Sequence, residues 1–337
     1  MKWIVYALLA SAVAAQSWIP QHSGTAASLR GVMAVSAKAA WASGSQGTFL
    51  RTIDGGANWQ NGQVSGAADA DFRGLWAFDE QTAILLSIGK GEKSRVYKSN
   101  DGGATWNLLY TNPDPEGFFD AIAFWDAAHG ILLGDPVDGR FMILTTSDGG
   151  VTWKRQRGPA AMPKEGAFAA SNSCLFLRGT REAWFGTGGF ATGGGRVFHS
   201  TDGGETWSAA KTRFAHESDS TGIFSLAFSD ERHGVAVGGD YKKPADTANN
   251  AALSVNGGKS WASPAAPPSG YRSAVAYIAP AKMWIATGTS GSDVSADGGR
   301  TWKNFDRGAY NALSFSGETG WAVGPKGAIA RFRLTSP

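Results

Sequence analysis

The sequence of 337 residues contains a single cysteine, Cys174, and little net charge. One cysteine excludes an internal disulfide, and because Cys174 lies in an apolar segment far from the N-terminus, we interpret it as a small core residue rather than a lipid-anchor site. The 31 Lys and Arg stand against 28 Asp and Glu, for a net charge of +3. A nucleic-acid binder has a stronger basic bias, so we expect no nucleic-acid partner.

Helical periodicity and recognisable cofactor motifs are also missing. No stretch shows the 3.6-residue apolar repeat of an amphipathic helix. The five histidines lack the spacing of metal ligands, and no glycine-rich phosphate-binding loop stands between a strand and a helix. We therefore expect no metal and no cofactor. With 42% apolar and 18% charged residues, the chain nevertheless has ample material for a core.

The N-terminus resembles a secretory signal. Lys2 precedes an apolar run from Trp3 to about Ala10, and the small residues after it suit cleavage after Ala14 or Ala15. The run is shorter than the roughly 20 residues that span a bilayer, which disfavours the alternative of a membrane anchor. We expect residues 1–15 to be a signal peptide and the mature chain to be exported, periplasmic or extracellular, without an integral membrane segment.

One eight-residue motif, [Ser/Thr]-x-[Asp/Asn]-Gly-Gly-x-[Thr/Ser/Asn]-Trp, occurs six times, at 52–59, 99–106, 146–153, 200–207, 254–261 and 295–302. An acidic side chain that accepts backbone hydrogen bonds, followed by two glycines able to adopt positive φ, favours a tight β-hairpin, and the tryptophan suits the apolar layer beneath it. We assign a structural role to the acidic or amide positions and the tryptophans: Asp54, Asp101, Asp148, Asp202, Asn256, Asp297, Trp59, Trp106, Trp153, Trp207, Trp261 and Trp302. The alternative, a row of catalytic or metal-binding carboxylates, is weaker, because turns repeated around a fold act as scaffold.

This motif is identified as the Asp-box, or bacterial neuraminidase repeat, which occurs in β-propellers of several functions. Successive boxes start 47, 47, 54, 54 and 41 residues apart, which fits propeller blades of roughly 40 to 50 residues. Alignment on the boxes gives seven units of short strands, which start near Leu29, Phe72, Phe119, Asn172, Ile223, Tyr271 and Tyr310. We predict an all-β fold, a seven-bladed β-propeller that forms one domain over residues 16–337.

The last unit contains only three predicted strands and no box. Ser17 and Trp18 resemble the end of a box, and Trp18 precedes Leu29 by eleven residues, as Trp302 precedes Leu313. We therefore predict that the strand containing Trp18 is the outer strand of the seventh blade. Closure of this kind removes the exposed edges of an open array.

Loop variation predicts which face of the ring binds a partner. The boxes share one face with short, similar turns, where His129 and His233 fall at equivalent positions and are interpreted as turn residues rather than metal ligands. Long, non-repeating loops lie on the other face, where propellers usually keep their binding sites.

On the loop face, three arginines sit before the inner strands of units one, two and six, at what we align as one repeat position. We expect them to form a basic arc for an anion or an acidic partner, the alternative being that each is solvated or pairs with a loop carboxylate. The full set of partner-binding candidates is Arg30, Arg73, Arg272, Asp120, Asn311, Arg140 and Arg213.

The segments 320–329 (GWAVGPKGAI) and 44–49 (GSQGTF), each in a unit of this pattern, resemble the photosystem II stability and assembly factor family over nearly the whole mature chain. The resemblance implies a seven-bladed propeller that binds an unassembled reaction-centre subunit on the lumenal side of photosynthetic membranes and carries an arginine patch. Arg30, Arg73 and Arg272 are the candidates for that patch. We expect a monomeric protein-binding or assembly factor, with a polypeptide or another acidic partner.

Two alternatives belong to other functional classes. A sialidase-like glycoside hydrolase would also use Asp-box blades, with an arginine cluster for the substrate carboxylate, a Tyr/Glu pair and an Asp acid. Its Arg-Ile-Pro signature is absent, Trp18-Ile19-Pro20 being no substitute, and no Tyr/Glu pair is evident from spacing. The third possibility is a purely structural extracellular module. We favour a binding protein over an enzyme and assign no catalytic residue.

Overall fold

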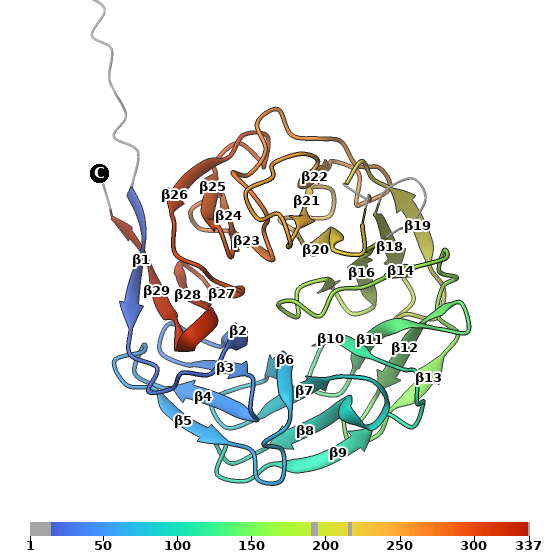
Figure 1. Cartoon of the computed structure of the whole chain (residues 1–337), viewed down its shortest axis with the longest axis vertical. Helices are drawn as coiled ribbons and strands as arrows, with labels where there is room; N and C mark the ends of the chain where they lie inside the picture. The colour runs from blue at the N-terminus through green and yellow to red at the C-terminus, as the bar shows by residue number, and fades with distance from the viewer. Residues whose placement is uncertain (1–14, 190–194, 215–217, 336–337) are drawn as a thin grey trace, which may run out of the picture.

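The computed structural model describes residues 15–189, 195–214 and 218–335. Over these residues the strands form seven sheets, which stand as blades in a ring around a central axis (Figure 1). The helical segments in the same ranges are two short 3-10 helices, η1 (Gly91–Lys93) and η2 (Pro325–Gly327). The predicted all-β, seven-bladed propeller is confirmed.

In blades one, two, three, four and six the chain runs from the inner strand outward. Blade one contains β2 (Leu29–Ala34), β3 (Ala40–Gly44), β4 (Thr48–Thr52) and β5 (Gln60–Gln63). Blade two contains β6 (Asp71–Ala77), β7 (Ala83–Ile88), β8 (Arg95–Ser99) and β9 (Asn107–Thr111). Blade three contains β10 (Phe119–Phe124), β11 (Gly130–Val137), β12 (Arg140–Thr146) and β13 (Lys154–Gln156). Blade four contains β15 (Leu175–Arg178), β16 (Glu182–Gly186), β18 (Arg196–Ser200) and β19 (Ser208–Lys211).

Blade five contains β20 (Thr221–Phe228), β21 (Gly234–Asp240) and β22 (Ala251–Ser254). Blade six contains β23 (Ala274–Ile278), β24 (Met283–Gly288), β25 (Gly291–Ser295) and β26 (Lys303–Asp306). Blade seven contains β27 (Ala312–Ser316), β28 (Thr319–Val323), β29 (Ile329–Thr335) and β1 (Ala15–Gln21). The apolar core lies between neighbouring blades, as where Trp41 and Phe49 of blade one share a buried cluster with Leu75 and Leu85 of blade two.

Blade five departs from the four-stranded pattern of the other blades in two ways. The strand that follows the box at 254–261 is reduced to one bridge between Leu253 and Ala262. Prolines at 264, 267 and 268 follow, and proline cannot donate to a strand ladder. On its inner side the sheet gains two short strands that the sequence did not predict, β14 (Glu165–Gly166) and β17 (Gly188–Gly189).

The ring closes through the N-terminal strand, as predicted. Strand β1 pairs antiparallel with β29 and places Trp18 opposite Phe332, so the sheet order is β1-β29-β28-β27. In Figure 1 the two ends of the described chain meet at this blade. Of the expected signal peptide, residues 1–14 lie outside the described residues and Ala15 begins β1, so the signal remains a prediction.

The six boxes share one hydrogen-bond pattern, which supports their structural interpretation. In every box the hydroxyl of the first residue accepts the N–H of the second glycine at 2.8 to 3.0 Å. The Asp or Asn oxygen accepts the N–H of the residue before the tryptophan at 2.9 to 3.0 Å. Both glycines have φ between 71° and 90°, which a residue with a Cβ rarely adopts.

These hydrogen bonds predict sensitivity to acid. Bonds from the residue before the tryptophan lower the pKa of Asp54, Asp101 and Asp148 from 3.8 to about 2. Because the pKa is depressed in the folded state, the stabilisation is complete above pH 4 and is lost as the pH falls toward 2. We expect the melting temperature from circular dichroism to drop over that interval.

An Asp148→Asn variant provides the matched control, because Asn256 already fills the same position in the fifth box and accepts the Ser260 N–H at 3.0 Å. The variant should keep the hairpin and lose part of the drop in melting temperature between pH 4 and pH 2. An undiminished drop would show that the Asp148 carboxylate does not contribute to it.

Candidate functional site

A cavity of about 500 Å³ opens at the mouth of the central channel, on the face opposite the boxes. Its walls come from the starts of inner strands, from the residues after the second strands of blades five and six, and from residues 167–170. Those last residues belong to the segment between β14 and β15, which reaches from the ring toward its centre in Figure 1. The predicted candidates Arg30, Arg73, Asp120 and Asn311 all line this central pocket.

A shared backbone irregularity aims four of the lining side chains inward. Strand pairing shifts register at Leu29/Gly31, Phe72/Gly74, Phe119/Ala121 and Ile223/Ser225. The residue left out of the ladder at these bulges is Arg30, Arg73, Asp120 and Phe224 respectively. A β-bulge bends its strand and redirects a side chain. The propeller repeat therefore presents two cations, one carboxylate and one aromatic ring from equivalent positions of blades one, two, three and five.

Arg272 does not belong to this set, which corrects the expected arc. Its side chain is fully buried; Nε donates to Asp293 Oδ2 at 2.6 Å, and Nη1 donates to the carbonyl of Tyr271 at 2.7 Å. Gly44 packs on the backbone of Leu29 as Gly288 packs on that of Arg272, so Arg272 corresponds to Leu29. The residue that corresponds to Arg30 is Ser273, which does line the pocket.

Two further candidates lie away from the pocket. Arg140 begins β12 in blade three and donates from Nη1 to the carbonyl of Gly158 at 2.9 Å. Arg213 is exposed on the loop that follows β19. Of the five candidate arginines, the pocket contains only Arg30 and Arg73. The expected basic arc therefore consists of these two residues.

The two pocket arginines differ in their hydrogen-bond partners. Arg73 is anchored, because Nε donates to Asp71 Oδ2 at 2.8 Å and Nη1 donates to the Ala169 carbonyl at 3.1 Å. Arg30 is half-buried, and its Nε has no hydrogen-bond partner among the described residues. Burial and the repulsion of Arg73 lower the pKa of Arg30 to about 10, still well above neutral pH. Arg30 is therefore a charged side chain of the pocket whose Nε is unbonded within the described part of the chain.

Asp120 is the second unsatisfied group. Its side chain is 1% exposed, and neither carboxylate oxygen has a hydrogen-bond partner among the described residues. Burial and the nearby Asp135 raise its pKa well above the usual value; the Ala169 N–H, which approaches without ordinary hydrogen-bond geometry, and Arg73 offset only part of this. Burial also raises the pKa of Asp135 to about 6, although its Oδ1 accepts the Ala167 N–H at 2.9 Å.

An aromatic wall that the sequence did not reveal completes the pocket. Phe168 stacks on Phe224 with ring centroids 3.9 Å apart, and Tyr271 meets Phe224 edge-on at 4.9 Å. Tyr241 lies edge-on to Phe224 at 6.1 Å and is 46% exposed. Only Phe224 could have been assigned to the pocket from the sequence, because it occupies the repeat position of Arg30. The other rings come from loops of unequal length.

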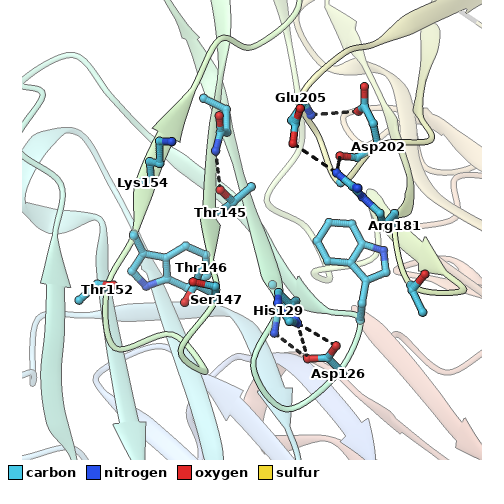
Figure 2. A pocket seen from close by; sticks show the side chains of 16 residues that line it. Asp126, His129, Thr145, Thr146, Ser147, Thr152, Lys154, Arg181, Asp202 and Glu205 are labelled. Carbon is cyan, nitrogen blue, oxygen red and sulfur yellow. Dashed lines mark hydrogen bonds and ion pairs between the residues drawn. The ribbon is translucent and has the colours of Figure 1, made fainter.

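A second cavity, of about 580 Å³, lies on the box face between blades three and four (Figure 2). Four of its side chains form two pairs: His129 Nδ1 lies 2.9 Å from Asp126 Oδ2, and Arg181 Nη2 lies 3.2 Å from Glu205 Oε1. His233 pairs with Asp230 in the same way in blade five, so both histidines are turn residues, as predicted. The histidine pairs lie within single turns, and Arg181 joins its turn to the fourth box.

The described ranges offer neither a metal-binding cluster nor a membrane-spanning helix. No group of three or more His, Cys, Asp or Glu side chains is placed to hold a metal ion. None of the helices in those ranges has the length and apolar character needed to cross a membrane.

Comparison with known proteins identifies the repeat and the fold. The BNR/Asp-box repeat model matches residues 198–209, whereas no curated protein matches the sequence. A structure of YCF48 bound to D1 peptide superposes with a TM-score of 0.65 at 18% identity, covering 97% of this chain and 100% of that one. YCF48 from Cyanidioschyzon merolae gives 0.64 at 17% identity, covering 95% and 99%. The WD40 repeats of RRP9 give 0.63 at 13% identity, covering 96% and 99%. This chain is a seven-bladed β-propeller with BNR/Asp-box repeats and has the fold of YCF48.

Proposed function

We propose that this protein is an exported, non-catalytic propeller that binds a segment of another polypeptide in its central pocket, as a binding or assembly factor. The observation that carries the proposal is Arg30, a half-buried guanidinium whose Nε has no partner among the described residues and which lines a cavity on the loop face. A buried donor left unsatisfied costs about 1 to 3 kcal/mol, so a ligand that supplies an acceptor recovers that cost.

Two further facts support a polypeptide partner. YCF48, which has the same fold, has been seen bound to D1 peptide. The pocket lies among long loops at the mouth of the channel, where an extended segment can enter from solvent. Export is supported by the signal-like N-terminus, and N-terminal sequencing of the protein recovered from the envelope or medium should find Gln16, or Ala15, as the first residue.

The test removes one charge at the pocket and the same charge elsewhere. An Arg30→Gln variant should capture at least tenfold less partner from the native envelope fraction than the wild type, as quantified by mass spectrometry. An Arg232→Gln variant is the matched control, because Arg232 is exposed in the turn between β20 and β21 on the box face. Capture should weaken with salt, as electrostatic binding does. Equal capture by both variants would remove Arg30 from the binding site.

The glycosidase alternative has less support from the pocket. Tyr271 and Asp120 are present, but glutamate is not among the described residues that line the cavity, so the Tyr/Glu pair of a sialidase has no counterpart there. Incubation of the wild-type protein with a fluorogenic sialoside tests whether the protein is a glycosidase or a binding protein. Hydrolysis above the level of an Asp120→Asn variant would replace the binding function by an enzymatic one.

A further inference from the structure

We propose that the central pocket is bipolar, with Asp120 receiving the ammonium group of a lysine side chain while Arg30 receives a carboxylate of the same polypeptide segment. This inference rests on the proposed function and adds a requirement to it. The partner segment is not simply acidic, because it must carry a cation as well.

The first argument is the state of the Asp120 carboxylate. Both oxygens are buried and unpartnered among the described residues, although Asp120 lines the pocket. Arg73 does not satisfy it, because Nε and Nη1 of Arg73 are engaged by Asp71 and by the Ala169 carbonyl. A buried carboxylate without donors is costly, and a ligand that brings three N–H donors on one ammonium group removes that cost.

The second argument is the aromatic wall of the same cavity. Phe168, Phe224 and Tyr241 line the cavity of about 500 Å³ that Asp120 and Asp135 also line. A lysine side chain can lay its alkyl stem along such a surface while its ammonium reaches a charge at the end. The volume falls within the roughly 300 to 1,000 Å³ of ordinary ligand sites.

The third argument is charge. A segment with only carboxylates would satisfy Arg30 but would place further negative charge beside Asp120 and Asp135. Like charges at a desolvated site disfavour binding, so the two aspartates select against a purely acidic ligand. Arg30, Arg73 and Asp120 come from blades one, two and three in turn, so the pocket carries positive and negative charge along its rim.

Protonation supplies an independent readout. The charged or titratable groups that face Asp120 are Asp135 on β11, Arg73 on β6 and Cys174, just before β15. Burial and Asp135 raise the Asp120 pKa well above its usual value, which favours the protonated carboxyl before binding. An ammonium favours the ionised carboxylate, so binding releases a proton and affinity rises with pH until Asp120 is fully ionised.

Three small probes separate the two ends of the pocket. Nα-acetyl-lysine has both charges, Nα-acetyl-norleucine has the carboxylate alone, and Nα-acetyl-lysine amide has the ammonium alone. Chemical-shift titration of the wild-type protein should show Nα-acetyl-lysine binding at least tenfold more tightly than either single-charge probe. Its affinity should rise as the pH is raised through the titration of Asp120, whereas that of Nα-acetyl-norleucine should not.

Variants assign each preference to a residue. Asp120→Asn keeps the side-chain shape and should remove the tenfold advantage and the pH dependence. Nα-acetyl-norleucine should bind this variant at least as tightly as the wild type, because one repulsive carboxylate is gone. Arg30→Gln should weaken binding of Nα-acetyl-norleucine and leave binding of Nα-acetyl-lysine amide unchanged. Arg232→Gln should change the binding of none of the three probes. If Asp120→Asn does not fold, the relative affinities of the three probes for the wild-type protein still test whether the pocket binds both charges.

The outcomes distinguish this inference from the proposed function. Arg30-dependent binding of Nα-acetyl-norleucine that equals binding of Nα-acetyl-lysine would overturn the bipolar pocket and leave the proposed function intact. Capture of a polypeptide that persists in Arg30→Gln would overturn the proposed function. Failure of all three probes to bind would overturn the bipolar pocket as well.

Discussion

Replacing Arg272 with alanine should lower the free energy of unfolding by about 3 to 5 kcal/mol, without any loss that is specific to partner binding. Arg272 and Asp293 both have fully buried side chains, and the guanidinium and carboxylate are bonded directly. Burial lowers the pKa of Arg272, and the attraction of Asp293 opposes that shift. Removal of the arginine would leave a carboxylate in the core with only Ser269 to bond it.

The matched control removes both charges. A double variant, Arg272→Met with Asp293→Leu, replaces the pair by apolar side chains and should recover at least half of the lost stability, since buried ion pairs are often no better than well-packed apolar groups. Urea unfolding followed by tryptophan fluorescence measures both variants. A loss below 1 kcal/mol for Arg272→Ala would show that the pair is not essential to blade six.

The contrast between Arg30 and Arg272 shows where sequence reasoning stops. Arg30 lies in the first residues of an inner strand and Arg272 lies just before another. The sequence alignment gave both the same repeat position, but their positions differ by one residue, which puts Arg30 in the pocket lining and Arg272 in the core. In a strand, neighbouring side chains point to opposite sides, so such a slip reverses the environment. The correct register depends on glycine contacts across the strand pair, which the box spacing does not constrain.

The fold was more predictable than the site because its signals are local and repeated. Six boxes identified the turns of six blades, and the eleven-residue spacing after Trp18 identified the closing strand. The short strands β14 and β17 join residues from different units, and two-residue pairings have no periodicity to detect. Phe168 and Tyr241 reach the pocket from loops without a repeat, so their convergence required coordinates.

Replacement of Trp18 with alanine should cost about 3 to 5 kcal/mol and favour opening of the ring. The indole is 5% exposed and packs against Phe332 of its own blade at 5.3 Å and against Tyr310 at 5.7 Å. Its Nε1 also donates to Ser292 Oγ in blade six at 3.0 Å. Trp18 therefore ties the closing strand both to blade seven and to its neighbour.

Ile19→Ala is the matched control, because Ile19 is the next residue of β1 and is 39% exposed. This variant should lose only about 0.5 kcal/mol of unfolding free energy, as for ordinary surface positions. Thermal unfolding with light scattering should show Trp18→Ala melting earlier and aggregating, because release of β1 exposes the edge of β29 to pairing with another chain. Equal, small shifts in both variants would mean that backbone pairing alone closes the ring. A large shift in Trp18→Ala alone would show that packing of the indole stabilises ring closure. Trp18 lies where the first and last described strands, β1 and β29, pair.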